Sequence, residues 1–207
     1  RNQLEGFVKT KRKVYNYPDI SFNVMSAICI ADFDETLLKA DSTKYVIRAE
    51  KLYLKGNIFF WICLFFVATR LLPRRWQFFV RRKAKYAVLR ELDRRGAQKI
   101  CDKYSKALLP FLNVELIRKL KRDYQAVYII SSGWQPLIES VLLAAGFTGT
   151  PVVATKLTEN FRDFQTCWYT NKVGVVQKLG LKDFDLFTDS QDDKPLMVLA
   201  GKTTFVK

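Results

Sequence analysis

The sequence predicts an α/β fold, in which a parallel β-sheet is covered by helices and carries an all-helical insert. An apolar, strand-like run stands at residues 26–31, and from residue 126 onward short apolar runs alternate with helical patterns. Between them, residues 36–125 show helical spacing and no convincing strand. Strands that alternate with helices imply right-handed crossovers, and therefore a parallel sheet.

The first strand ends in acids. The run "AICIA" is short, continuous and partly β-branched, which is typical of a fully buried parallel strand. Asp32, Phe33 and Asp34 follow it directly. Ligands of open parallel sheets bind at the carboxyl ends of the strands, and residues two apart on an extended chain point the same way. The alternative is a solvated turn whose acid caps a helix in "ETLLKA".

The helical insert follows the first strand and is expected to form a cap over the carboxyl edge of the sheet. We expect residues 25–40 and 110–207 to form the core and residues 41–109 to form the cap. Residues 1–24 are interpreted as an extension in front of this core.

An uninterrupted apolar run of eleven residues lies inside the insert, at residues 58–68. A bilayer-spanning helix needs about 20 apolar residues, so this run is too short to cross a membrane. Two interpretations stay open. The run is a buried helix of a small bundle, or it dips into a membrane interface where the arginines that follow meet lipid phosphates.

The second half of the chain gives the remaining elements of the sheet. Strands are expected at residues 126–131, 151–155, 185–190 and 203–207. Amphipathic helical patterns connect them, and glycines mark their ends.

Composition narrows the chemistry. The chain contains no histidine, which excludes Ser-His-Asp and Cys-His catalysis and disfavours zinc. Its four cysteines show no CxxC spacing and are interpreted as reduced, small apolar residues of a cytosolic protein. The formal net charge of +15 favours anionic partners. The excess is local, because residues 70–106 hold thirteen Lys and Arg but only three acids.

Polar residues follow three of the expected strands. They are Asp32 and Asp34 after the first, Ser131 at the end of the second, and Asp189 at the end of a later one. Lys172 begins a helix just before that later strand. Carboxylates from two strand ends can share a hard cation such as Mg²⁺, and a hydroxyl and an ammonium can hold phosphate oxygens.

Four motifs in order resemble those of the haloacid dehalogenase-like phosphatases. They are "DFDET" at 32–36, "IISSG" at 129–133, Lys172, and "TDSQDD" at 188–193. The helical insert resembles the phosphoserine phosphatase-like subgroup. The segments "SSGWQPLIESV" and "TDSQDDKPLM" are similar to those of phosphatidylglycerophosphatase C and related lipid or glycan phosphatases. The resemblance implies a three-layer α/β/α, Rossmann-like sheet with an inserted helical cap.

The resemblance also implies roles and a cofactor. Asp32 would be the nucleophile and Asp34 the general acid and base. Mg²⁺ would be bound by Asp32, the Asp34 carbonyl and Asp189. Ser131 and Lys172 would bind the phosphoryl group, and Asp193 would orient Lys172 or a metal-bound water.

Three departures from the motifs matter. Glu35 stands where glycine is common, Thr188 replaces a glycine, and Asp192 beside Asp193 leaves open which of the two faces the site. The spacing favours Asp193.

The expected activity is Mg²⁺-dependent hydrolysis of a phosphomonoester. The substrate is a lipid-linked phosphate such as phosphatidylglycerophosphate, or a soluble one such as phosphoserine. The basic, apolar insert favours an anionic membrane surface as partner, so the protein is expected to be cytoplasmic and peripheral to the membrane. Two alternatives stay open, a receiver-like phospho-acceptor and a non-catalytic module that binds anions through its basic helices. Nucleic acid is the less favoured partner, because its phosphates need no carboxylate pair.

Overall fold

The fold is a five-stranded parallel sheet between two layers of helices. A further group of helices lies beyond the carboxyl ends of two of its strands. The structure is a computed structural model that describes residues 27–71 and 73–206, and for 66–70 and 74 it describes the backbone alone. The expected extension at 1–24 therefore lies outside the described residues. In order across the sheet, the strands are β3 (Val152–Thr155), β2 (Ala126–Trp134), β1 (Ile28–Ala31), β4 (Phe184–Thr188) and β5 (Lys202–Phe205).

Every neighbouring pair of strands is parallel, as the alternation of strands and helices predicts. The α/β fold class predicted from the sequence is confirmed. One strand is longer than expected, because β2 continues past Ser131 to Trp134. The pairing of β2 with β3 is irregular between Ile130 and Trp134. The residues at the end of β2 therefore do not continue the regular hydrogen-bond pattern of the sheet.

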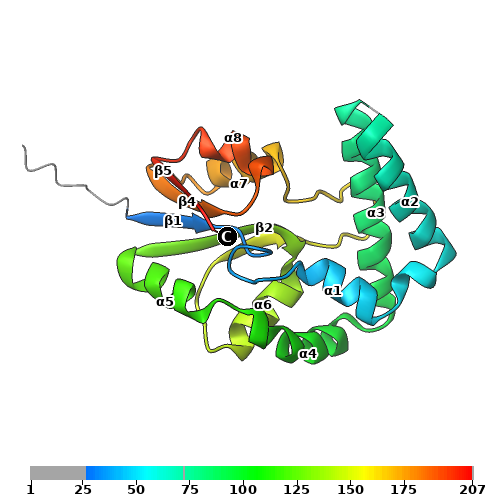
Figure 1. The fold of residues 1–207 in the computed structure, drawn as a ribbon, viewed down its shortest axis with the longest axis horizontal. Coiled ribbons are helices and arrows are strands. Elements are labelled where there is room, and N and C mark those ends of the chain that lie inside the picture. The colour runs from blue at the N-terminus through cyan, green and yellow to red at the C-terminus, as the bar shows by residue number, and fades with distance from the viewer. Residues whose placement is uncertain (1–26, 72, 207) are drawn as a thin grey trace, which may run out of the picture.

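Alternate residues of each strand face opposite helix layers. On β1, Cys29 and Ala31 pack into the core shared with the helices on one side, whereas Ile30 packs into a second core on the other. The first layer contains α4 (Ala97–Leu108), α5 (Val114–Asp123) and α6 (Gln135–Ala144). The second contains α7 (Thr170–Lys178) and α8 (Lys194–Met197), as Figure 1 shows.

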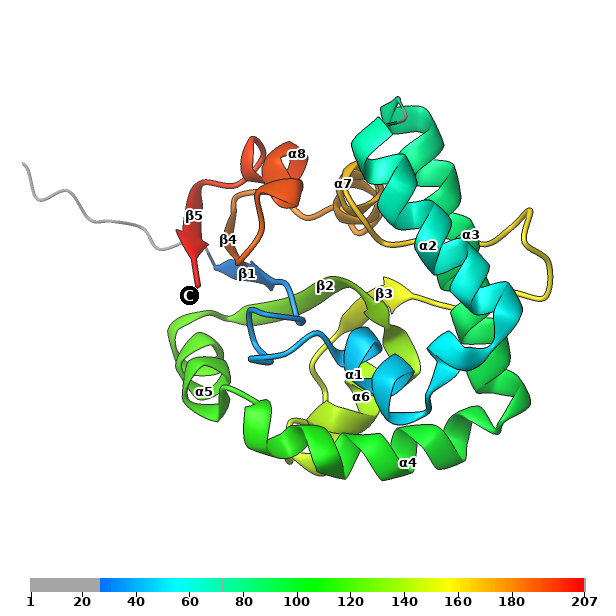
Figure 2. The same cartoon turned by 45° about the vertical axis from the view of Figure 1, so that its right-hand side comes forward.

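In the described residues between 36 and 125, all regular elements are helices. They begin with α1 (Ser42–Ala49), the 3-10 helix η1 (Leu52–Leu54), α2 (Gly56–Leu71) and α3 (Arg74–Arg94). The 3-10 helix η2 (Leu109–Phe111) leads from α4 into α5. Helices α1, α2 and α3 stand beyond the carboxyl ends of β1 and β2 (Figures 1 and 2). The division into cap and core at residues 41 and 110 stays a prediction.

The apolar run 58–68 belongs to α2, which packs against α3 and is buried on one face only. Ile58 is fully buried, but Phe59 and Phe60 are more than half exposed. Among the described residues, no helix is both long and apolar enough to cross a bilayer. All four cysteines are free, and three of them are buried whereas Cys63 is exposed.

Candidate active site

The carboxyl end of β1 places two aspartates at the edge of the sheet. The Asp32 amide still donates a hydrogen bond to the Phe187 carbonyl at 2.9 Å, which extends the β1–β4 ladder by one residue. Beyond it the chain turns out of the sheet. Asp32 is buried, at 8% exposure, and one of its carboxylate oxygens accepts a hydrogen bond from the Phe33 amide at 2.7 Å.

Lys172 joins Asp32 to a second carboxylate. Its ammonium donates to Asp32 at 2.8 Å and to Asp193 at 2.9 Å. Lys172 and Asp193 are almost fully buried, at 1% and 2% exposure. Burial by itself would lower the pKa of Lys172, but the two carboxylates outweigh it and raise the pKa above its ordinary value. The ammonium therefore stays charged.

Asp193 rather than Asp192 faces this network. Its carboxylate also accepts a hydrogen bond from the Thr188 hydroxyl at 2.7 Å. Asp192 is exposed and accepts a hydrogen bond from the Trp168 indole at 3.1 Å. Thr188, which stands where the motif usually has glycine, thus fixes Asp193 and removes no carboxylate from the site.

Asp34 differs from Asp32 in its surroundings. One carboxylate oxygen accepts a hydrogen bond from the Ser42 amide at 2.8 Å. Burial, followed by the nearby charge of Asp41, raises the pKa of Asp34 to about 7. Gly133 makes room for this side chain, because a Cβ at that position would lie 2.9 Å from the second Asp34 oxygen.

Asp189 completes the set of strand-end acids. One of its oxygens accepts a hydrogen bond from the Thr36 hydroxyl at 3.1 Å. Burial raises the pKa of Asp189, and the negative charges of Asp32 and Glu35 add to the effect. Glu35 has a φ of 61°, the left-handed region that favours glycine, which accounts physically for the glycine common at this position of the motif.

Ser131 and Ser132 take different positions. Ser131 is fully buried, and its hydroxyl accepts a hydrogen bond from the Gly133 amide at 3.2 Å. Ser132 lines the cavity beside the aspartates, and its carbonyl accepts hydrogen bonds from Lys85 and from Thr155.

The strand-end residues surround a cavity of about 240 Å³. Acids and bases dominate its lining: Asp32, Asp34, Glu35, Asp41, Lys44, Arg81, Ser132, Trp168, Lys172, Asp189, Ser190, Asp192 and Asp193. Helices α1 and α3 close the cavity opposite the sheet. Seven acids around so small a space repel one another unless cations or protons compensate them.

The donor chemistry of this cavity suits Mg²⁺. In the described part of the chain, no group of three or more His, Cys, Asp or Glu side chains is arranged to hold a metal ion. The donor set implied by the motifs needs two carboxylates, Asp32 and Asp189, with one main-chain carbonyl. Mg²⁺ prefers such hard oxygen ligands and usually keeps several waters. Burial is the main reason that the pKa of Asp189 is raised, and a divalent cation would relieve the smaller contribution, which is repulsion by Asp32 and Glu35.

Two basic residues of α3 contribute to the site and were not predicted from the sequence, and neither was Lys44 of α1. Arg81 lines the cavity and stacks on Trp168, with its guanidinium carbon 3.8 Å from the ring centroid. Lys85 donates to the Ser132 carbonyl, and burial lowers its pKa to about 8, an effect that Asp34 partly offsets. The spacing 81, 85, 88 places both residues and Val88 on one face of α3, a signal visible in the sequence.

A second cavity of about 480 Å³ adjoins the first and shares Asp34, Asp41, Lys44, Arg81 and Ser132 with it. It lies between α1 and η1 on one side and α2 and α3 on the other. Its remaining lining is largely apolar and comprises Thr43, Ile47, Arg48, Tyr53, Ile62, Phe65, Ala84, Lys85 and Val88. The larger cavity beside Asp34 therefore has a mostly apolar wall that includes Arg48, Arg81 and Lys85, whereas the smaller cavity next to Asp32 and Lys172 is polar.

Comparison with known proteins assigns this fold and site to a family. Residues 29–197 match the model of the haloacid dehalogenase-like hydrolases. The chain therefore belongs to that family, and its prediction as an enzyme of this class is confirmed. A search of curated proteins returned no match.

Solved structures share the fold at low sequence identity. A phosphoserine phosphohydrolase-like protein from Francisella tularensis is 18% identical, with a TM-score of 0.51 over 84% of this chain and 82% of that chain. A family hydrolase from Salmonella enterica serovar Typhi is 15% identical, with a TM-score of 0.52 over 86% and 61%. Cytosolic 5′-nucleotidase IIIB, solved with cytidine, is 15% identical, with a TM-score of 0.55 over 86% and 72%.

Proposed function

We propose that this protein is a Mg²⁺-dependent phosphomonoester hydrolase that acts through an aspartyl-phosphate at Asp32. The proposal rests on the different surroundings of two carboxylates, Asp32 and Asp34, that line one cavity. Asp32 is paired with the Lys172 ammonium at 2.8 Å, which holds in place the carboxylate that acts as the nucleophile. The pKa of Asp34, about 7, suits a group that gives and takes a proton near neutral pH.

The first step transfers the phosphoryl group to the protein. A carboxylate oxygen of Asp32 attacks phosphorus, the bond from phosphorus to the leaving-group oxygen breaks, and Asp34 gives its proton to that oxygen. In the second step a water attacks phosphorus and passes a proton to Asp34. The bond between phosphorus and Asp32 then breaks, and phosphate leaves with Asp32 restored as a carboxylate. Both steps require mainly positioning and charge stabilisation.

The other residues of the cavity bind and orient. Lys172 holds the phosphoryl oxygens, and Asp193 fixes the Lys172 ammonium at 2.9 Å. Ser131 stays the predicted second phosphate ligand, although in this structure it is fully buried and Ser132 lines the cavity. Arg81 faces the same cavity and adds positive charge for an anionic ester. Mg²⁺, held by Asp32, Asp189 and the Asp34 carbonyl, would supply further positive charge to the phosphoryl oxygens.

The second cavity supports an apolar leaving group. Because Asp34 protonates the leaving oxygen, the alcohol must extend to the side of Asp34. That side is the 480 Å³ cavity walled by Ile47, Ile62, Phe65 and Val88. We therefore propose a lipid-linked phosphomonoester, of the phosphatidylglycerophosphate type, in preference to a small polar ester such as phosphoserine.

A phosphate-release screen with Mg²⁺ tests the reaction and the substrate class together. The panel comprises lipid phosphates, sugar phosphates and phosphoserine. Asp32→Asn is expected to abolish release. Glu115→Gln is the matched control, because it removes an exposed carboxylate that does not line the cavity. Val88→Trp is expected to lower turnover of the lipid phosphate more than that of a small ester. Equal losses on both would count against an apolar leaving-group site, and full activity of Asp32→Asn would exclude the mechanism.

A further inference from the structure

The hairpin of α2 and α3 extends away from the sheet (Figures 1 and 2). The middle of α3 is fixed to the loop that follows β3. Arg82 donates to the carbonyls of Phe161, Arg162 and Phe164, and the Tyr86 hydroxyl donates to the Glu159 carbonyl at 2.8 Å. The hairpin is therefore anchored at the middle of α3, and the end where α2 meets α3 points away from the core.

Large apolar side chains are exposed on this hairpin. On α2, Phe59 and Phe60 are 55% and 57% exposed. Near the far end, Leu71 and Trp76 are 76% and 49% exposed. Isolated exposed apolar residues are ordinary, but a concentration of aromatic ones marks a surface that contacts another apolar phase. We refer to Phe59, Phe60, Cys63, Leu71, Arg75 and Trp76, all exposed, as the hairpin surface.

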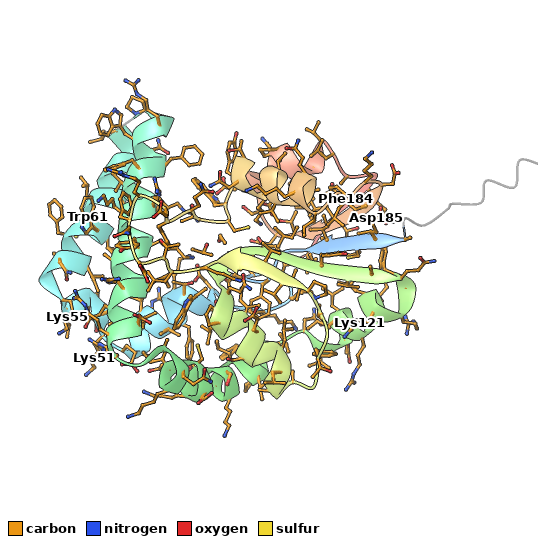
Figure 3. The ribbon with its side chains drawn as sticks, turned by 180° about the vertical axis from the view of Figure 1, so that it is seen from behind. Lys51, Lys55, Trp61, Lys121, Phe184 and Asp185 are labelled. Carbon is orange, nitrogen blue, oxygen red and sulfur yellow. The ribbon has the colours of Figure 1, made fainter. Side chains whose placement is uncertain are left out.

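The charge of the hairpin indicates what the hairpin surface contacts. Residues 56–90 contain eight Lys and Arg and no Asp or Glu, although Arg81 and Lys85 line the cavities and Arg82 is bound to the loop after β3. Arg75 is exposed beside Trp76. At the base, Lys51 and Lys55 flank η1, and Trp61 lies farther along α2; all three are on the side away from the sheet (Figure 3). Lys55 is 3.8 Å from Glu91. Between residues 56 and 90, the combination of exposed aromatic rings with Arg75 and without acids matches an anionic lipid headgroup region. A second copy of a chain with a net charge of +15 would instead be repelled.

The same helix separates this surface from the apolar cavity. Ile62 and Phe65 of α2 line the cavity from inside, whereas Phe59, Phe60 and Cys63 lie on the outer face. Helix α2 has 16 residues, a length of about 24 Å at 1.5 Å per residue. A helix of this kind can lie in the plane of the interface with one face in the headgroup region.

We propose that the α2–α3 hairpin docks this enzyme onto anionic lipid bilayers through the hairpin surface. The aromatic side chains enter the headgroup boundary, and Arg75 pairs with lipid phosphates. Docking requires no catalysis, so it can be tested separately from the proposed reaction.

Vesicle co-sedimentation tests the proposal. The probe is vesicles of phosphatidylcholine mixed with phosphatidylglycerol, and pure phosphatidylcholine vesicles serve as the neutral reference. The catalytically blocked Asp32→Asn chain is expected to bind as wild type does, so failure of the phosphatase assignment would not affect this result. Phe59→Ser with Phe60→Ser is expected to weaken binding about tenfold. Arg75→Gln is expected to weaken binding to the anionic vesicles about fivefold and to change nothing on the neutral ones.

Matched controls identify the surface. Leu143→Ser with Val198→Ser removes two side chains that are 66% and 84% exposed but lie outside the hairpin. This pair should bind vesicles as wild type does. Thermal unfolding confirms that each variant folds. If the wild type fails to bind anionic vesicles, or if hairpin and control pairs weaken binding equally, the proposal is wrong. A hairpin pair that changes only self-association would also overturn it, in favour of contact between copies.

Discussion

Replacing Lys172 with methionine is expected to destabilise the fold strongly, because it leaves two buried carboxylates without their cation. Lys172 is 1% exposed and lies 2.8 Å from Asp32 and 2.9 Å from Asp193. Removing one partner of a buried ion pair typically costs about 3–5 kcal/mol. At about 2–4 °C per kcal/mol for a chain of this size, the melting temperature should fall by roughly 6–20 °C at pH 7.

The pH dependence of that loss can be derived from the direction of the pKa shift. The pKa of Lys172 is higher in the folded than in the unfolded state. Its contribution to the free energy of unfolding is therefore complete below the unfolded-state pKa, and it is lost only as the pH rises through the folded-state pKa. The loss in Lys172→Met is therefore full at neutral pH. It should shrink in acid, where the unpaired carboxylates take up protons.

Urea unfolding at pH 7 and in mild acid measures both effects. Lys178→Met is the matched control, because Lys178 is exposed at the end of the same helix, and it should change stability by less than about 0.5 kcal/mol. Adding Asp193→Asn to Lys172→Met should recover part of the loss, since one buried charge is then removed. A Lys172→Met variant that unfolds within about 1 kcal/mol of wild type would refute the role of this network in stability.

Three further predictions follow from local geometry. Gly133→Ala should reduce turnover at least about tenfold, because its Cβ would lie 2.9 Å from an Asp34 oxygen and 2.8 Å from the buried Ile138 side chain; steady-state kinetics measures the turnover, circular dichroism checks the fold, and unchanged turnover would contradict the prediction. Glu35→Gly should stabilise the fold by up to about 1 kcal/mol in thermal unfolding, because glycine adopts the φ of 61° without strain; a lower melting temperature would contradict it. Hydrogen bonds from Tyr104 and then Lys103 lower the pKa of Glu50 to about 2, so Glu50 stabilises the fold above pH 4.5 and loses that effect as pH falls toward 2. In urea titrations Glu50→Gln should therefore cost about 1 kcal/mol at pH 7 and little near pH 2, and a cost independent of pH would refute the assignment.

Much of the fold could be predicted from the sequence because its signals are local. The buried runs and the helical spacings each span one element, and the parallel order follows from their alternation. The same logic brings Asp32, Asp189 and Lys172 to one edge, since the carboxyl ends of parallel strands meet there. Their catalytic roles still rest on the experiments described above.

Features that depend on packing between distant segments were not predictable. Lys85 reaches the Ser132 carbonyl only because α3 packs beside the carboxyl end of β2. The sequence does not indicate where α3 packs. The difference between buried Ser131 and cavity-lining Ser132 depends on the irregular end of β2. The apolar run in α2 gave two interpretations because its composition is uniform, whereas its exposure differs between faces.

Peptide mapping of the acid-quenched enzyme tests the central claim most directly. During Mg²⁺-dependent turnover of a phosphomonoester, a phosphoryl group should be found on Asp32, and it should be absent in Asp32→Asn. Turnover that continues in Asp32→Asn, or a phosphoryl group on any other residue, would contradict the proposed mechanism.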